Sequence, residues 1–231
     1  MDDFVSQVAG VSALAEPARR ALYLYVVAQP EPVSRDQAAA GADLPRHTAK
    51  FHLDKLVEEG LLDTEYRRLS GRRGPGAGRP TKLYRRSARQ VAITLPQRHY
   101  ELAGQILAGA VESAATGGTP VLEAVQRAAA EAGRRLGAAE NRRDVRSSPS
   151  PLDELAAVLA AHGYEPRVQG DAIVLVNCPF HALAREHTVL VCGMNLHLIT
   201  AMLDELGCAQ VRAALDPVPD RCCVTVTGGS P

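Results

Sequence analysis

The first forty residues have the apolar spacing of two helices. Apolar side chains recur at helical intervals after Pro17, a residue tolerated in a first helical turn, and predict a helix that ends near Gln29. Ser34 and Gln37 stand three residues apart, as in a capping box, and predict a short second helix over residues 35–40.

A third helix is predicted between Asp43, which is placed to cap it, and Gly60. Its expected buried stripe is Ala49, Leu53, Leu56 and Val57. Its opposite face carries Arg46, His47, Lys50 and Asp54. After Gly60, extended segments 61–69 and 82–86 enclose a Gly/Pro-rich stretch, 71–80, and predict a long-tipped β-hairpin.

Three helices followed by a hairpin predict a winged helix-turn-helix, whose third helix enters the major groove while the hairpin follows the DNA backbone. Residues 66–89 hold nine Arg and Lys and no acid. Alone, such a run is as typical of a solvated loop as of a binding site, but the glycine-rich tip lets the backbone approach phosphates closely. Arg46, His47 and Lys50 on the third helix are plausible donors to base edges. Gly78-Arg79-Pro80 is similar to segments that insert one arginine into a minor groove. The expected DNA-binding residues are Arg46, His47, Lys50, Arg72, Arg73, Arg79 and Lys82.

The rest of the chain predicts an α+β fold. A helix over 97–115 and an alanine-rich helix after Pro120 are interpreted as a dimer-forming or linking layer, because the small N-terminal core does not account for them. A polar linker follows at 141–150, and short strands then alternate with helices. The predicted domains are a DNA-binding winged helix over 1–96, a helical dimerisation and linker region over 97–150, and a cysteine-rich sensor domain over 151–231.

Charge separates the two ends of this neutral, 231-residue chain. Basic residues outnumber acidic ones 15 to 11 over 1–96, whereas acidic residues lead 9 to 4 over 151–231. The N-terminus lacks the pattern of a signal peptide, and the apolar stretches are broken before they span a bilayer. We therefore expect a cytoplasmic protein without membrane contact, whose cysteines bind metal or sense redox state instead of forming structural disulfides.

Five cysteines, all after residue 177, are the candidate chemistry of the sensor domain: Cys178, Cys192, Cys208, Cys222 and Cys223. No Cys-x-x-Cys pair occurs, so only tertiary structure can bring them together. Cys178 and Cys192 are expected at helix N-termini, where free backbone N–H groups stabilise thiolates. Asn177 and Asn195 are expected to hydrogen-bond sulfur. This chemistry suits an iron–sulfur cluster, which needs thiolate ligands.

Other readings of these cysteines stay open. Each can be a small apolar core residue, Cys208 above all. The doublet Cys222-Cys223 is expected to point to opposite strand faces, so that one member faces the site, and His181 is a spare ligand. A zinc site, or a thiol switch with the doublet as its reactive pair, is the alternative sensor. An enzyme is not expected, because no dinucleotide fingerprint or acid–base pair is present.

Several stretches of this sequence resemble the Suf repressor family, cluster-binding regulators within the ArsR-like winged-helix group. The resemblance covers nearly the whole chain. It is carried by the stretch from His47 to Leu56 with Gly60-Leu61-Leu62, by Gly78-Arg79-Pro80, and by Asn177-Cys178-Pro179-Phe180-His181, Val191-Cys192-Gly193-Met194-Asn195-Leu196 and Arg221-Cys222-Cys223-Val224.

The resemblance implies a homodimeric repressor of iron–sulfur cluster assembly genes. Such a protein binds an inverted-repeat operator in double-stranded DNA when it carries its cluster, of the [4Fe-4S] type, and loses DNA affinity without it. The implied ligands are Cys178, Cys192, Cys208 and Cys223, with Cys222 as the alternative to Cys223.

Overall fold

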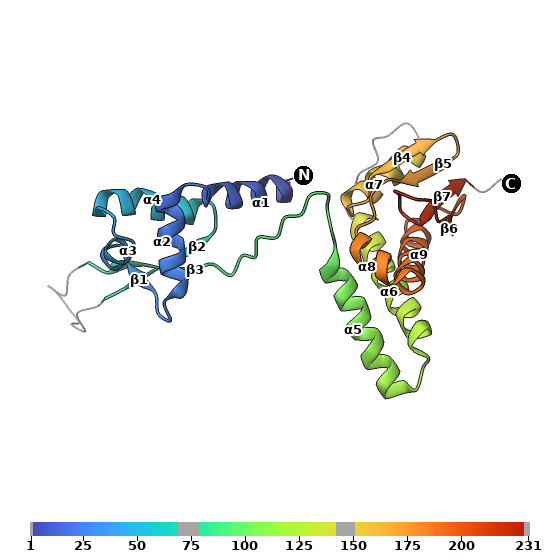
Figure 1. The fold of residues 1–231 in the computed structure, drawn as a ribbon, viewed down its shortest axis with the longest axis horizontal. Coiled ribbons are helices and arrows are strands. Elements are labelled where there is room, and N and C mark those ends of the chain that lie inside the picture. The colour runs from blue at the N-terminus through green and yellow to red at the C-terminus, as the bar shows by residue number, and fades with distance from the viewer. Residues whose placement is uncertain (1, 69–78, 142–150, 229–231) are drawn as a thin grey trace. The chain divides into compact units, whose positions relative to one another are not determined.

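The computed structural model describes residues 2–68, 79–141 and 151–228, and forms two compact units that divide between Ile93 and Thr94. Each unit has its own hydrophobic core. The units are described separately below (Figure 1).

The first unit packs its helices around a small antiparallel sheet. Its elements are α1 (Asp2–Ala13), α2 (Pro17–Ala28), β1 (Val33–Ser34), α3 (Arg35–Gly41), α4 (Arg46–Glu58), β2 (Leu62–Arg67) and β3 (Thr81–Arg86). The sheet order is β1-β3-β2, with Leu62 opposite Arg86 at one end of the hairpin and Arg67 opposite Thr81 at the other. Leu22 of α2 and both Leu53 and Leu56 of α4 are fully buried in the core beneath. The predicted winged-helix order is therefore confirmed over the described residues.

Of the two helix N-caps predicted in this unit, one is correct and one is wrong. The Ser34–Gln37 capping box is present. The predicted Asp43 cap is wrong: Asp43 has a left-handed φ of 52°, and Pro45 is the N-cap of α4, without a side-chain hydrogen bond. The reason is that α4 begins at Arg46, too far along for the Asp43 carboxylate. The pattern analysis also missed α1 and the two-residue strand β1.

The second unit combines helices with a four-stranded antiparallel sheet. Its elements are α5 (Tyr100–Gly117), α6 (Val121–Asn141), α7 (Pro151–Ala161), β4 (Pro166–Gln169), β5 (Ala172–Leu175), α8 (His181–Glu186), α9 (Thr188–Glu205), β6 (Val211–Leu215) and β7 (Val224–Gly228). The sheet order is β4-β5-β7-β6, so that the last strand lies in the interior of the sheet. This mixture of helices and sheet agrees with the α+β prediction.

The helices predicted as a separate layer share one core with the cysteine-bearing elements. Ile106 and Ala110 of α5 are buried in the same cluster as Leu159, Ile173 and Leu198. Two further apolar side chains of α5 remain outside the core, since Tyr100 is 39% and Val111 59% exposed. Most of the expected linker, 142–150, lies outside the described residues.

Helices α6 and α9 approach each other unusually closely. A Cβ added at Gly133 would lie 2.1 Å from the Leu198 carbonyl oxygen, and one added at Gly137 would lie 3.0 Å from that of Met202. Glycine at these two positions therefore sets the distance between the two helices. The crossing holds α9, which carries Cys192, against the core.

Candidate DNA-binding surface and cysteine site

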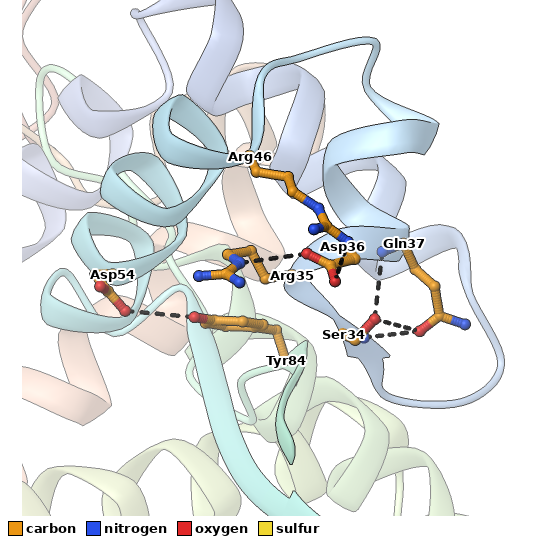
Figure 2. A network of polar contacts seen from close by, with 7 residues as sticks. All are labelled: Ser34, Arg35, Asp36, Gln37, Arg46, Asp54 and Tyr84. Atoms are coloured by element: carbon orange, nitrogen blue, oxygen red, sulfur yellow. Dashed lines mark hydrogen bonds and ion pairs between the residues drawn. The ribbon is translucent and has the colours of Figure 1, made fainter. Parts of the chain in front are cut away.

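The predicted recognition helix, α4, presents its basic residues to solvent. Arg46, His47 and Lys50 are exposed on its first two turns, while Leu53 is buried on the other side. The Arg46 guanidinium donates to the Asp36 carboxylate of α3 across 2.6 Å, and Arg35 contacts the same carboxylate (Figure 2). The two helices of the helix-turn-helix are thus joined by an exposed ion pair at the end that carries the candidate base-reading side chains.

Asp54 connects the recognition helix to the wing. Its carboxylate accepts from Lys82 Nζ of β3 at 2.8 Å and from Lys50 Nζ at 3.0 Å. It also accepts from the Tyr84 hydroxyl at 3.4 Å (Figure 2). Burial alone would raise the pKa of Asp54, but the hydrogen bonds from the two lysines outweigh it and hold this pKa below its usual value. Asp54 therefore fixes the position of two cations that the sequence predicts to contact DNA.

The structure places the remaining predicted DNA contacts unequally. Arg79 is exposed two residues before β3, and Lys82 lies on that strand. Arg72 and Arg73 lie outside the described residues. An open groove of about 410 Å³ runs between α3, α4 and the wing, and Lys50, Lys82 and Thr81 line it. The sequence pattern does not indicate the roles of Asp36 and Tyr84. The pair of Lys50 with Asp54 does have a recognisable signal, because the two residues stand four positions apart on a helix.

Four of the five cysteines gather in the second unit. Cys192 of α9 is joined to Cys223 by a disulfide with a Cα–Cα distance of 6.3 Å. Cys178, in the loop before α8, is buried beside Cys222 and receives a hydrogen bond from its thiol. Cys222 and Cys223 are consecutive in the chain, so the backbone between them links the two sulfur pairs. Three segments of the chain that are distant in sequence thus bring their cysteines together.

The local backbone around these cysteines differs from what the sequence pattern predicts. Cys192 lies inside α9, not at a helix N-terminus, because the apolar run from Val189 to Val191 already belongs to that helix. Cys178 precedes the six-residue helix α8 by three positions. Cys222 and Cys223 stand before β7 instead of within it, so strand alternation does not separate them and both reach the site.

Cys208 and His181 stand apart from this group. Cys208 is half-buried between α9 and β6, where burial and then the nearby Glu154 carboxylate raise the pKa of its thiol. His181 is exposed at the start of α8. Among the residues that the structure describes, no three His, Cys, Asp or Glu side chains are arranged as a metal-ion site.

A buried hydrogen-bond chain reaches one sulfur of the group. Asn195 Nδ2 donates to Cys222 Sγ at 3.3 Å, and the Tyr164 hydroxyl donates to the Asn195 carbonyl oxygen. The Cys222 thiol in turn lowers the pKa of Cys178 by hydrogen bonding, against the opposing effect of burial. Burial and the hydrogen bond to Cys178 raise the pKa of Cys222 itself. The predicted sulfur contact of Asn195 is therefore confirmed.

The predicted contact of Asn177 with sulfur is wrong, because its side chain hydrogen-bonds backbone carbonyls instead. Its Nδ2 donates to the backbone carbonyls of Gly163, at 2.6 Å, and Gln97, at 3.1 Å. Arg98 donates to the Asn177 side-chain oxygen and, at 3.0 Å, to the Cys178 carbonyl. The His99 N–H donates to the Pro179 carbonyl at 3.1 Å. We call these contacts between residues 97–99 and 177–179 the clasp; nothing in the sequence pattern indicated it.

Among the described residues, no helix is both long enough and apolar enough to cross a membrane.

Comparison with protein families gives one match, a helix-turn-helix domain at residues 14–65, which spans α2 to β2. No curated protein and no solved structure matches the chain. The matched domain is a DNA-binding regulatory domain. Together with the exposed basic face of α4, the match shows that this chain is a DNA-binding transcription regulator of the helix-turn-helix class.

Proposed function

We propose that this regulator is a cytoplasmic, homodimeric repressor of iron–sulfur cluster assembly genes, and that an iron–sulfur cluster of the [4Fe-4S] type controls its binding to an inverted-repeat operator. The observation that supports the proposal is the pairing of four cysteines from three segments, Cys192 with Cys223 and Cys178 with Cys222. A regulator does not need buried cysteines in contact for DNA binding itself.

The donor set fits the proposed group. Iron–sulfur clusters are held by cysteine thiolates and are tuned by hydrogen bonds to sulfur and by exclusion of solvent. Cys178, Cys192, Cys222 and Cys223 would hold the cluster. The first three are buried and Cys223 is half-buried, and Asn195 donates a hydrogen bond to Cys222. Cys208 is replaced in this ligand set by Cys222, because it stands outside the gathered cysteines.

The clasp supplies a route from the cysteines to DNA binding. When bound, a cluster supplies an oxidation- and iron-sensitive cross-link between the chain segments that carry its ligands. Arg98 and Asn177 hold the Cys178 loop to residues 97–99, which continue directly from the segment that joins the two units. A change in the conformation of the Cys178 loop would therefore displace the backbone that leads to the DNA-binding unit.

The proposed dimer has a candidate surface on α1. Four large apolar side chains at helical spacing are exposed there, namely Phe4, Val5, Val8 and Val11. Contiguous exposed apolar side chains on a helix are typical of protein–protein contacts, and a twofold dimer would match the symmetry of an inverted repeat. A second copy of this chain is the occupant that an inverted-repeat operator requires.

The experiment is to purify the protein without oxygen and to measure its visible absorption, iron and acid-labile sulfide. We expect a visible band with equal amounts of iron and sulfide in the parent and in Cys208→Ser, and loss of both in Cys178→Ser and Cys192→Ser. Circular dichroism checks that each variant is folded. Iron content unchanged in Cys178→Ser, or lost equally in Cys208→Ser, would overturn this ligand set.

The disulfide supports a second candidate, a thiol switch. Here Cys192 and Cys223 react, instead of the adjacent Cys222 and Cys223 that the sequence suggests. A hydroperoxide would take up two electrons, giving an alcohol and water, while the two thiols lose their hydrogens and form the S–S bond. A colourless, iron-free protein whose DNA affinity changes with this disulfide would favour the switch. Stoichiometric zinc in the same elemental analysis would favour the zinc alternative.

A further inference from the structure

The second unit contains an apolar cavity that none of the functions above uses. Its volume is about 200 Å³, and α5, α6 and α9 provide much of its wall. Leu102, Leu136 and Met202 line it together with the rings of Tyr164 and Phe180. An apolar cavity of about 150 Å³ holds a benzene molecule, so this one has room for a somewhat larger ligand.

One polar atom in the cavity wall lacks a partner. Nε2 of His99 is buried and has no hydrogen-bond partner among the described residues. Burial lowers the pKa of His99, so its ring is neutral at physiological pH. In a neutral imidazole this nitrogen either donates or accepts one hydrogen bond. A hydroxyl group satisfies both cases, because it can accept and donate.

Two residues of the wall also touch the cysteine site. Tyr164 donates to Asn195, which donates to Cys222. His99 belongs to the clasp through its N–H bond to Pro179. A molecule in the cavity would therefore contact both the hydrogen-bond chain at Cys222 and the backbone of the clasp.

We propose that this cavity is a binding site for a small, neutral, mostly apolar molecule with a single hydroxyl group, which hydrogen-bonds His99 Nε2. The lining is mostly apolar, and its second histidine, His162, already lies 3.6 Å from the Glu140 carboxylate, so a charged ligand would be buried without a free counterion. The volume limits the ligand to about the size of a substituted phenol. Occupancy of the cavity gives the regulator an input that goes beyond the proposed cluster.

The test compares two probes of nearly equal shape, p-cresol and p-xylene, in which a methyl group replaces the hydroxyl. Their affinities for the full-length protein are measured by isothermal titration calorimetry. We expect p-cresol to bind about tenfold more tightly, as one satisfied hydrogen bond in a buried site allows. In His99→Phe, which keeps a ring without the nitrogen, the two affinities should agree within about twofold.

Variants of the wall separate the cavity from other surfaces. Leu136→Trp should fill it and abolish binding of both probes, and Leu102→Phe should weaken both if the first variant is unstable. Val189→Trp, at a position 83% exposed in the same unit, should bind like the parent. Absence of p-cresol binding to the folded parent, or an unchanged preference in His99→Phe, would overturn the proposal.

The same titration is run on Cys178→Ser and on protein prepared without iron. Binding of p-cresol to both would show that the cavity binds its ligand without a cluster, so that this proposal stands even if the cluster proposal is wrong. Loss of binding in both would refute an independent site and tie the cavity to the state of the cysteines.

Discussion

Asp54 of the recognition helix accepts a hydrogen bond from Lys82 of the wing at 2.8 Å while it also pairs with Lys50 one turn earlier on its own helix. One carboxylate thus pairs with two lysines that are candidate DNA contacts, and it sets the position of the recognition helix relative to the hairpin. These ion pairs lower the affinity for DNA, because the negative charge of Asp54 offsets part of the attraction between the two lysines and the phosphates. We infer that Asp54 favours defined geometry over maximal attraction to any duplex.

Asp54→Asn should strengthen binding to unrelated DNA by about two- to fivefold, because exposed ion pairs of this kind are worth less than about 1 kcal/mol. Preference for the operator should fall, since the wing is no longer held by an ion pair. Fluorescence anisotropy with operator and scrambled duplexes measures both effects. Asp63→Asn, which removes a looser 3.7 Å pair with Arg85 on the hairpin, is the matched control and should change the preference less.

Lys50→Ala and Arg79→Ala should each weaken DNA binding. For a lysine that contacts one phosphate, the slope of log affinity against log salt should fall by about one unit, and the loss should be similar for all sequences. Arg79 should instead show the larger loss on A·T-rich operators if it enters the minor groove. Arg127→Ala, which breaks an exposed pair in the second unit, is the control. Parent-like affinity of both variants at moderate salt would refute the DNA contacts.

Asn177→Ala should lower the free energy of unfolding by about 1–3 kcal/mol, because it leaves buried backbone carbonyls without their donor. A double-mutant cycle with Arg98→Ala should give a coupling energy of at least about 0.5 kcal/mol. Chemical denaturation measures both quantities. If the clasp transmits the state of Cys178, these variants should also reduce the difference in operator affinity between iron-loaded and iron-free protein; an unchanged difference would exclude that route.

Gly133→Ala should destabilise the protein by at least about 2 kcal/mol, since the added methyl group would overlap the Leu198 carbonyl and force α6 and α9 apart. Gly109→Ala in α5 is the matched control, because nothing lies within 4 Å of its added Cβ. That substitution should stabilise the helix by about 0.5–1 kcal/mol. Thermal unfolding of both variants should show midpoints shifted in opposite directions.

Stability should fall as the pH drops below 6.5, in part because of His99. Burial lowers the pKa of His99 below its ordinary value of 6.5, so the unfolded chain binds a proton that the folded chain refuses. The stability that His99 contributes is complete above pH 6.5 and is lost as the pH falls toward the lower pKa of the folded state. His99→Phe should therefore flatten the pH dependence of the unfolding free energy in this range, which chemical denaturation at a series of pH values measures.

The sequence predicts the DNA-binding unit better than the sensor unit because its signals are local. The Ser34–Gln37 capping box and the four-residue spacing of Leu53 with its neighbours depend on contacts within one or two turns. The hairpin strands are likewise set by local pairing. The miss at Asp43 is local too, because the proline two residues later moves the start of the helix.

The cysteine site depends on contacts that no local pattern contains. The disulfide partners are separated by 31 residues, and Arg98 meets Asn177 across 79. That cysteines gather could be predicted from their number, but not which ones, because the choice between Cys208 and Cys222 depends on the path of the chain after α9. The cavity around His99 is likewise assembled from five segments and has no sequence signal.

The position of the cysteine doublet in the chain has a consequence for protein synthesis. Cys222 and Cys223 lie just before β7, the interior strand that pairs with both β5 and β6. A ribosome has therefore made the whole DNA-binding unit, and every helix of the second unit, before the residues that complete the site exist. A nascent or truncated chain that stops after β6 keeps the recognition helix but holds neither sulfur pair. Under the proposed function, such fragments lack ligands that would hold the cluster, so control of DNA binding begins only after residues 222 and 223 have been made.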